Sequence, residues 1–147
     1  MPKGRSLLNR YRGKRVLHIG TATPAEEIVR YLKSEGAYVI LAGRSPDSVR
    51  PFREIADETV CLDVYDVPSV IAFAKEHQIT AVTHSGSEAS VEPVRLINEA
   101  IGNTYLHTAK QWQTFANKSN FRSLCNQFGL ASPRTFFKGP ASDLPKH

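Results

Sequence analysis

Short apolar runs alternate with segments of helical periodicity along the first two thirds of the chain. Between the runs, apolar side chains such as Ala25, Val29 and Leu32 return every three or four positions, as on one face of a helix. A strand, a helix and a second strand in succession form a βαβ unit, whose crossover is right-handed. Five runs indicate buried strands: Arg15–Gly20, Tyr38–Ala42, Thr59–Leu62, Ile79–His84 and Thr104–His107. The pattern therefore predicts an α/β fold, an open doubly wound parallel sheet with strand order 3-2-1-4-5.

Polar residues and glycines mark the ends of the expected helices. Thr23 and Glu26 have the spacing of a capping box, in which each side chain bonds the backbone of the other residue. Thr108 and Gln111 repeat this spacing, and Asn117 can cap the helix that follows. Three glycines come after the expected last turns: Gly36, Gly102 and Gly129.

The alternation of strands and helices stops after residue 107. A helix over Thr108–Phe115 and a second helix after Asn117 precede an extended stretch at Arg134–Lys138. Two helices in tandem indicate that the sheet is complete and that another domain begins. We therefore expect a basic, flexible arm over residues 1–14, an α/β domain over residues 15–107 and a helical segment over residues 108–147.

The positive charge of the chain is concentrated at its beginning. The formal net charge is +5. Six basic side chains lie at or before the start of the first predicted strand: Lys3, Arg5, Arg10, Arg12, Lys14 and Arg15. Without them the chain has 13 basic and 14 acidic side chains, so the basicity belongs to the arm. Such an arm can contact a polyanion, but a solvated leader is the simpler interpretation, and we do not expect a nucleic-acid partner.

Composition and cysteine usage indicate an ordinary intracellular globular protein. Cys61 and Cys125 lie far apart in segments that we expect to be buried, which favours core packing in a reducing compartment over a disulfide framework. No apolar run approaches the roughly 18 residues of a membrane helix, so no membrane partner is expected. The basic N-terminus has no apolar stretch behind it and does not resemble a secretory signal. We expect a cytoplasmic protein.

Three segments in the last third of the chain resemble the entry motif of ATP-grasp ligases. They read TAKQW from Thr108, NKSNFR from Asn117 and GLASPRT from Gly129. The preceding hundred residues are similar to the N-terminal domain of that family, a Rossmann-like fold called the pre-ATP-grasp domain. Carbamoyl phosphate synthases, biotin carboxylases and purine-pathway ligases are members. The resemblance covers Arg15 to about Lys138.

The resemblance implies binding roles for five residues. Lys118 matches a basic residue that reaches the phosphates of ATP, and it lies in the first turn of a helix, where an anion is favoured. Gly20 and Thr21 follow the first strand, in a loop that approaches the substrate in relatives. Ser87 and Glu88 follow the fourth strand, where relatives place a glutamate that holds the acceptor. The alternative for Glu88 is a capping box with Ser85.

The family reaction implies partners beyond this chain. In it, ATP phosphorylates a carboxylate or bicarbonate, and an amine then displaces the phosphate. ATP and Mg²⁺ are implied for a complete enzyme, but the phosphate loop and metal ligands of the missing ATP-grasp domain do not occur before His147. We therefore assign no catalytic residue and expect the 147-residue chain to be inactive alone. The implied partners are a small-molecule substrate, the ATP-grasp domain and a second copy in a homodimer.

Two other classes of function stay open at this level. An NADP-dependent oxidoreductase of the short-chain type could seat a 2′-phosphate on Arg44 and adenine near Asp63. Against it, only Gly20 stands in the first loop, which lacks the glycine spacing for a pyrophosphate, and no Tyr-x-x-x-Lys pair exists. A non-catalytic binding or assembly module is the other alternative.

Three histidines lie near the ends of adjacent predicted strands: His18, His84 and His107. A metal site there would need side chains on one face and a carboxylate to complete the shell. A histidine inside a strand is more often a hydrogen-bonded core residue, so we assign no metal.

Overall fold

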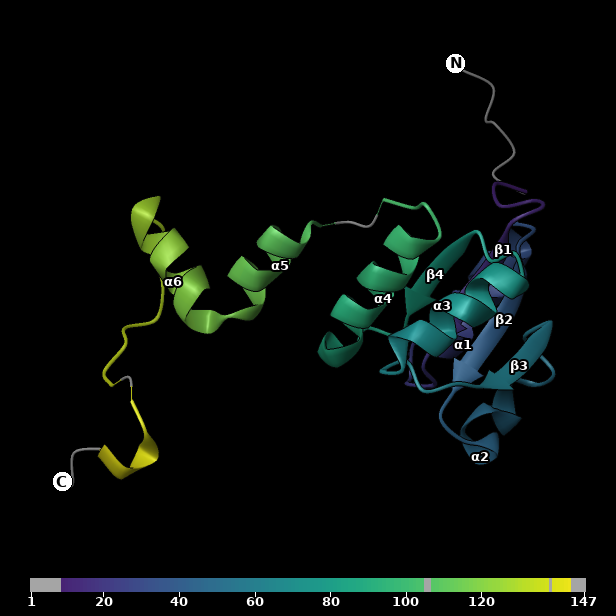
Figure 1. Ribbon diagram of the computed structural model, residues 1–147, viewed down its shortest axis with the longest axis horizontal. Coiled ribbons are helices and arrows are strands. Elements are labelled where there is room, and N and C mark those ends of the chain that lie inside the picture. The colour runs from purple at the N-terminus through teal and green to yellow at the C-terminus, as the bar shows by residue number, and fades with distance from the viewer. Residues whose placement is uncertain (1–8, 105–106, 138, 144–147) are drawn as a thin grey trace, which may run out of the picture. The chain divides into compact units, whose positions relative to one another are not determined.

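The computed structural model describes residues 9–104, 107–137 and 139–143 of the chain. They divide into two compact units, and the boundary along the chain falls between residues 106 and 107 (Figure 1). The strands are β1 (Arg15–Ile19), β2 (Tyr38–Gly43), β3 (Glu58–Cys61) and β4 (Ala81–His84). The helices are α1 (Ala25–Ser34), α2 (Pro46–Val49), α3 (Val67–Glu76), α4 (Glu88–Ala100), α5 (Ala109–Ala116) and α6 (Lys118–Gln127), with 3₁₀ turns η1 (Arg50–Phe52) and η2 (Ala141–Asp143).

The first unit contains a parallel sheet with strand order β3-β2-β1-β4. The central strand β1 sets the register, with Leu17 opposite Ile40 of β2 and Val82 of β4. Both central strands are buried along nearly their whole length, because helices cover both faces of a parallel sheet. The predicted doubly wound α/β class and the order 3-2-1-4 are confirmed.

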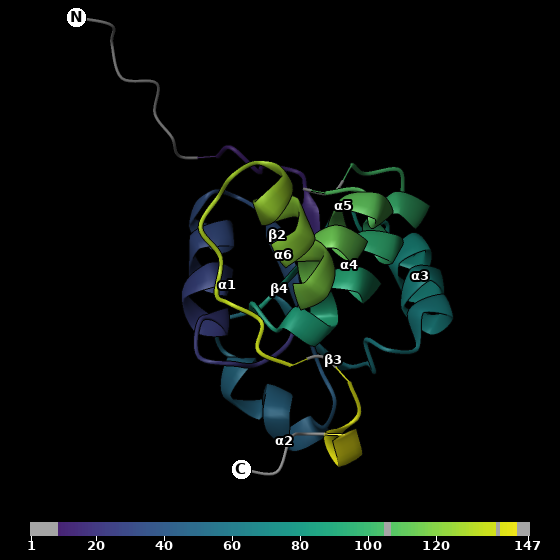
Figure 2. The ribbon, with the colours of Figure 1, turned by 90° about the vertical axis from the view of Figure 1, so that its left-hand side faces the viewer.

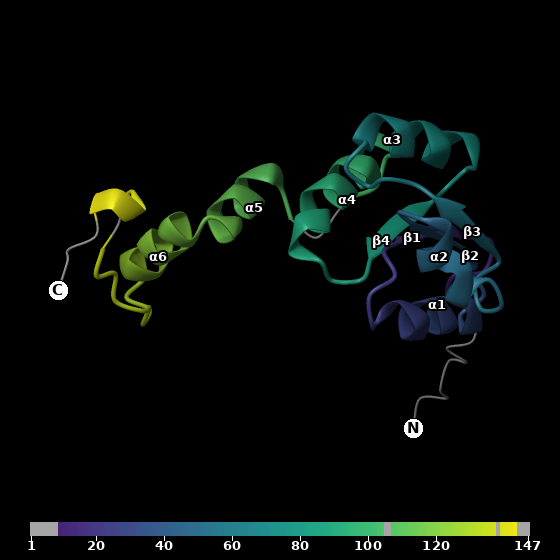
Figure 3. The ribbon, with the colours of Figure 1, turned by 90° about the horizontal axis from the view of Figure 1, so that it is seen from below.

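Alternate residues of the strands fill two separate apolar layers. Leu17 and Ile40 point into the layer beneath α3 and α4, together with Val82 and Ile97. Val16 and Leu41 point to the other face, where α1 and α2 cover the sheet. Figure 3 shows α3 and α4 on one side of the strands and α1 on the other. The period of two along each strand therefore produces the two-sided core.

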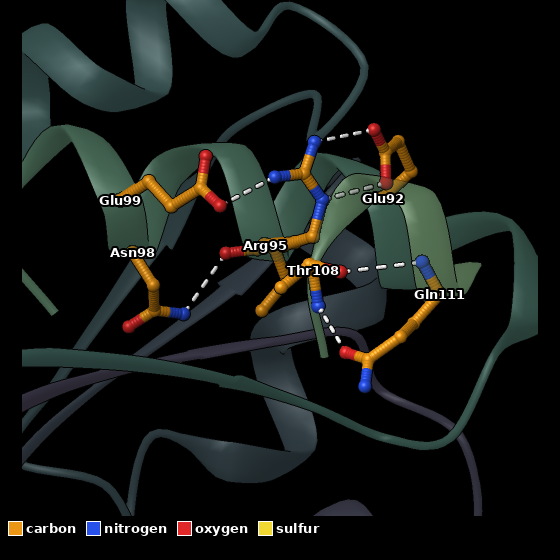
Figure 4. Close-up of polar contacts among 7 residues, drawn as sticks. Glu92, Arg95, Asn98, Glu99, Thr108 and Gln111 are labelled. Atoms are coloured by element: carbon orange, nitrogen blue, oxygen red, sulfur yellow. Dashed lines mark hydrogen bonds and ion pairs between the residues drawn. The ribbon is translucent and has the colours of Figure 1, made fainter. Parts of the chain in front are cut away.

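The expected fifth strand is not formed at its two described positions. Thr104 and His107 lie outside any strand, and residues 105–106 lie outside the described part of the chain. On the outer edge of β4, the side chain of Asn98 accepts a hydrogen bond from Val82 N (3.0 Å) and donates one to Val82 O (2.8 Å). Figure 4 shows Asn98 on α4. The amide thus makes the two bonds that a neighbouring strand would make at Val82.

The helix ends confirm some of the predicted caps and contradict others. The Thr108–Gln111 capping box is formed (Figure 4), and Asn117 accepts bonds from the first backbone amides of α6. The Thr23–Glu26 box was wrong: α1 begins after Pro24 without a side-chain cap, and Glu26 pairs instead with Arg30. Because Pro24 and not Thr23 is the N-cap residue, Glu26 stands at the second helical position and not at the third, which the box requires.

A short helix after β2 was missing from the sequence-based prediction. Ser45 and Ser48 form a reciprocal capping box at the start of α2, and Pro46 occupies its first position. Val49 and Phe52 are buried against the sheet. The Ser-Pro-x-Ser pattern carried this signal, although four residues are too few to show helical periodicity.

The described part of the basic arm packs against the rest of the first unit. The backbone amides of Arg10 and Tyr11 donate to Glu35, and Arg12 lies next to Gly36. Residues 1–8, with Lys3 and Arg5, lie outside the described residues. No helix in the part of the chain that the structure covers has the length and apolar character needed to cross a bilayer.

The second unit is built from α5, α6 and the segment after them. Phe115 and Phe121 pack at 5.9 Å between ring centroids, and Cys125 is buried. After Gly129, at φ +64°, residues 130–137 have no regular structure and run back beside α6 (Figure 2). The predicted stretch Arg134–Lys138 is described up to residue 137.

The two cysteines differ in exposure, and we expect them to differ in reactivity. Cys61 was expected to be buried but is exposed, because β3 is an edge strand without a buried residue, whereas Cys125 is 6% exposed. A maleimide should therefore modify Cys61 in the folded protein and Cys125 only after unfolding. Mass spectrometry of the native Cys61→Ser variant, which should stay unmodified, is the control. Equal rates for both thiols in the native protein would contradict this prediction.

Candidate functional site

The carboxyl ends of the parallel strands meet at one edge of the sheet and surround a hollow of about 280 Å³. Gly20 and Thr21 line it after β1, Arg44 lines it after β2, and Tyr65 lines it after β3. Ser90 of α4 closes one side. Open α/β sheets bind ligands at this edge. The structure therefore brings two of the predicted substrate residues, Gly20 and Thr21, into one cavity.

Gly20 is required by the geometry of this loop. Its φ is +100°, a conformation that side chains with a Cβ rarely adopt, and a Cβ would lie 3.3 Å from Ser85 Oγ. Its N–H donates to Ala42 O at 2.9 Å. The loop after β1 is thus held close to both neighbouring strands.

Ser85 joins the loops that follow β1 and β4. Its hydroxyl donates to Gly20 O at 3.1 Å and lies 2.9 Å from Nε2 of His18. Since the hydroxyl proton goes to Gly20 O, the His18 Nε2–H donates to Ser85 Oγ. The predicted Ser85–Glu88 capping box is consequently not formed, and α4 begins at Ser87 without a side-chain cap. Glu88 lies exposed in the first turn of α4.

Ser87 and Glu88 are not among the residues that line the hollow. They follow β4, and the Ser85 contacts fix the start of their loop relative to Gly20. Farther along α4, the buried guanidinium of Arg95 pairs with Glu92 and Glu99 (Figure 4). Hydrogen bonds with Glu92 and Glu99 raise the pKa of Arg95. These ion pairs stay within the helix that carries Glu88.

The buried histidine His18 is neutral. Its side chain has no exposed surface, and burial, with a smaller effect of His84, lowers its pKa to about 4. Burial also lowers the pKa of His84, whose Nδ1 accepts from Gly86 N at 3.1 Å. His107 belongs to the second unit, where it stacks on Trp112. The described residues contain no cluster of three or more His, Cys, Asp or Glu side chains suited to a metal ion.

Arg44 stands at the mouth of the hollow with two partners of its own. Its guanidinium lies 5.0 Å from the ring centre of Tyr65, and its Nε is 3.8 Å from Asp63. The Asp63 carboxylate would repel a 2′-phosphate placed on Arg44. The geometry thus gives no support to the oxidoreductase alternative.

A larger hollow of about 670 Å³ lies on the α1 side of the sheet. Apolar side chains dominate its lining, among them Val16, Ile28 and Leu32, with the rings of Tyr11 and Tyr31 in edge contact at 6.4 Å. Lys14 and Glu27 are the charged residues of its lining, and it shares no residue with the carboxyl-edge hollow, where open α/β sheets bind ligands. We therefore take the carboxyl edge as the candidate site.

Lys118, the predicted phosphate residue, is the first residue of α6 in the second unit. It is exposed and lines a separate hollow of about 270 Å³. The sequence analysis named Lys118 and did not name Arg122, which lines the same hollow one turn later. Spacing of four residues on a helix was the signal that could have paired them.

Comparisons with known proteins identify the fold. No family model and no curated protein matches the chain. Among solved structures, phosphoribosylglycinamide synthetase from Anaerococcus prevotii is similar over 79% of this chain and 29% of its own length, with TM-score 0.66 and 16% identity. N5-carboxyaminoimidazole ribonucleotide synthetase from Thermotoga maritima is similar over 82% and 32%, with TM-score 0.61 and 21% identity. Glycinamide-RNase-transformylase T from Mycobacterium tuberculosis is similar over 89% and 37%, with TM-score 0.60 and 23% identity.

These likenesses define the class of fold. The chain has the fold of a part of each of these three proteins. The chain spans about a third of the length of each.

Proposed function

We propose that this chain is the N-terminal, substrate-binding and scaffold part of an ATP-dependent carboxylate–amine or bicarbonate ligase that acts through an acyl phosphate. The observation that carries the proposal is the hollow at the carboxyl edge, where Gly20 and Thr21 lie in a fold like that of three such ligases. The names of two of these proteins, phosphoribosylglycinamide synthetase and N5-carboxyaminoimidazole ribonucleotide synthetase, refer to phosphorylated ribose derivatives. The proposed substrate class is therefore a small phosphorylated ribose derivative with an amine.

Each candidate residue has a role set by its chemistry. The positive φ of Gly20 lets backbone approach the ligand where a Cβ would collide, and the Thr21 hydroxyl can donate or accept a hydrogen bond. The exposed carboxylate of Glu88 would hold the acceptor amine, and the Ser87 hydroxyl would contact the same group. In the ligase reaction a carboxylate oxygen attacks the γ-phosphorus of ATP and ADP leaves. The amine then attacks the acyl carbon, and phosphate leaves as the amine loses a proton.

This chain supplies only some of the groups that binding of ATP and Mg²⁺ would need. Lys118 and Arg122 supply positive charge suited to phosphates, which ATP would provide as the activating group. No metal-binding cluster occurs among the described residues, so we assign no step through Mg²⁺ to them. An ATP-grasp domain outside these 147 residues is the proposed partner that completes the reaction.

We expect the 147-residue chain to form no ADP above background from ATP, Mg²⁺ and phosphoribosylglycinamide. The physical reason is that no described group is placed to activate both reactants. A coupled assay for ADP measures this. ATP-dependent product formation by the chain alone would overturn the claim of inactivity.

Binding at the carboxyl edge tests the substrate role directly. Titration of ¹⁵N-labelled protein with phosphoribosylglycinamide should shift the amide signals of Gly20, Thr21 and Ser87. Glu88→Gln should weaken this binding about tenfold, because a charge-assisted hydrogen bond is lost. Glu76→Gln, an exposed glutamate at the end of α3, is the matched control and should bind like the wild type.

Two outcomes would redirect the proposal. Equal losses for the Glu88 and Glu76 variants, or no shift near Gly20, would remove the substrate site. Tight binding of NADPH in the same hollow would favour the oxidoreductase. Sedimentation of the chain with and without residues 1–14 tests the homodimer and the assembly module. A smaller assembly for the shortened chain would show that the arm drives assembly.

A further inference from the structure

The larger hollow, on the α1 side of the sheet (Figure 3), lies where α1 leaves β4 uncovered. The apolar layer beneath α1 and α2 contains residues of β1 and β2, and among the described residues none of β4 belongs to it. Val82 packs into the other layer, so its neighbours Ala81 and Thr83 face the α1 side, opposite Val16 and His18 of β1. Both stay half-buried there and line the hollow, whose volume is about 670 Å³.

Most of this lining is apolar or aromatic. Ile28 and Leu32 present one edge of α1 to the hollow, and Val16 lies on its floor. Tyr31 is 49% exposed although its ring is in edge contact with Tyr11. A half-exposed ring beside a concave apolar lining favours a small ligand with an apolar or aromatic body.

Two opposite charges stand in the same lining. Lys14 directly precedes β1, and Glu27 lies in the first turn of α1. Neither forms an ion pair with the other or with any further side chain in the described part of the chain. The neighbouring Glu26, by contrast, is paired with Arg30. The hollow is therefore complementary to a molecule that carries one carboxylate and one ammonium group.

We propose that this hollow binds a zwitterionic α-amino acid with a large apolar side chain. The carboxylate of the ligand pairs with Lys14, its ammonium group pairs with Glu27, and its side chain packs on Leu32 and Tyr31. An indole side chain suits the lining best, because its N–H can donate to the hydroxyl of Thr83 on the floor. The inference goes beyond the proposed function, since this hollow shares no residue with the carboxyl-edge hollow.

The test is a titration of the ¹⁵N-labelled full chain with L-tryptophan at fixed ionic strength. The amide signals of Lys14, Glu27 and Thr83 should shift. Tryptamine lacks the carboxylate and indole-3-propionate lacks the ammonium group, so each should bind about fivefold more weakly, the effect of one ion pair at an exposed position. Both analogues keep the indole ring, so the binding that remains measures the apolar contacts.

Paired variants assign each charge to its partner on the ligand. Lys14→Gln should weaken tryptophan binding about fivefold and should not weaken tryptamine binding, because tryptamine has no carboxylate. Glu27→Gln should weaken tryptophan binding to the same extent and should not weaken binding of indole-3-propionate. Glu26→Gln, one residue away and outside the lining, is the matched control and should change the affinity for tryptophan less than twofold.

Four results would overturn the proposal: equal affinities of the wild type for tryptophan and its two analogues, equal losses for the Glu27 and Glu26 variants, shifts confined to Gly20 and Thr21, or no binding. Circular dichroism checks that each variant is folded, and the analogue series tests the proposal without any substitution. None of these results depends on the phosphoribosylglycinamide titration, so the two proposals fail separately.

Discussion

Replacing Asn98 by alanine should lower the free energy of unfolding by about 4 kcal/mol, the largest effect that we expect from a single substitution. The side chain is 3% exposed and bonds the N–H and C=O of Val82 and the C=O of Val94. Alanine leaves a buried donor and a buried acceptor on Val82 unsatisfied, and each costs about 1–3 kcal/mol. Urea denaturation followed by circular dichroism measures the change.

Asn103→Ala is the matched comparison for this prediction. The Asn103 amide donates to Thr80 O, in the residue before β4, and to Asn98 Oδ1 at 3.4 Å, but Asn103 is half-buried, so water can replace its amide. We expect a loss of about 1 kcal/mol for this variant. Equal stabilities of the two variants would show that the Val82 bonds contribute no more than a surface contact does.

Acidification should destabilise the protein through His18 by about 3 kcal/mol between pH 7 and pH 4. The folded imidazole has its pKa lowered from 6.5 to about 4, chiefly by burial. Between these values the unfolded state takes up a proton that the folded state does not, so lower pH favours unfolding. The contribution is complete above pH 6.5, declines as the pH falls through this window and is lost near pH 4.

The assignment to His18 is tested with a variant that does not titrate. Carboxylates also titrate in this window, so the informative quantity is the stability difference between wild type and His18→Gln, which should shrink as the pH falls. Val29→Ala removes apolar atoms from the same layer without a titrating group, and its deficit should be independent of pH. An NMR titration that gives His18 a pKa near 6.5 would refute the prediction.

Local patterns were sufficient for most of the first unit. Short continuous apolar runs located β1 to β4, and the switch to helical spacing located α1, α3 and α4. Capping residues failed where a distant partner competed for the same group. Ser85 could not be predicted to bond His18, which is 67 residues away in sequence, and that contact excluded the capping box with Glu88. Cys61 was misjudged because its burial was inferred from the apolar run alone, although the predicted strand order already placed this strand at the edge.

The candidate site was predictable only in its positions along the chain. Loops after parallel strands converge at one edge, which places Gly20 and Thr21 there from sequence alone. The partners that shape the site come from tertiary packing. Tyr65 beneath Arg44 and Thr135 beside Arg122 depend on side-chain orientation, which neither composition nor periodicity encodes.

The side-chain amide of Asn98 also affects whether the edge of the sheet at β4 can pair with a strand of another molecule. A strand that exposes free N–H and C=O groups is a template onto which a β-segment of another molecule can pair. At Val82 that template is already filled from within the chain. Without the Asn98 carboxamide, a strand of another molecule could therefore pair with the edge of β4. A substitution that destabilises the fold would then also promote polymerisation.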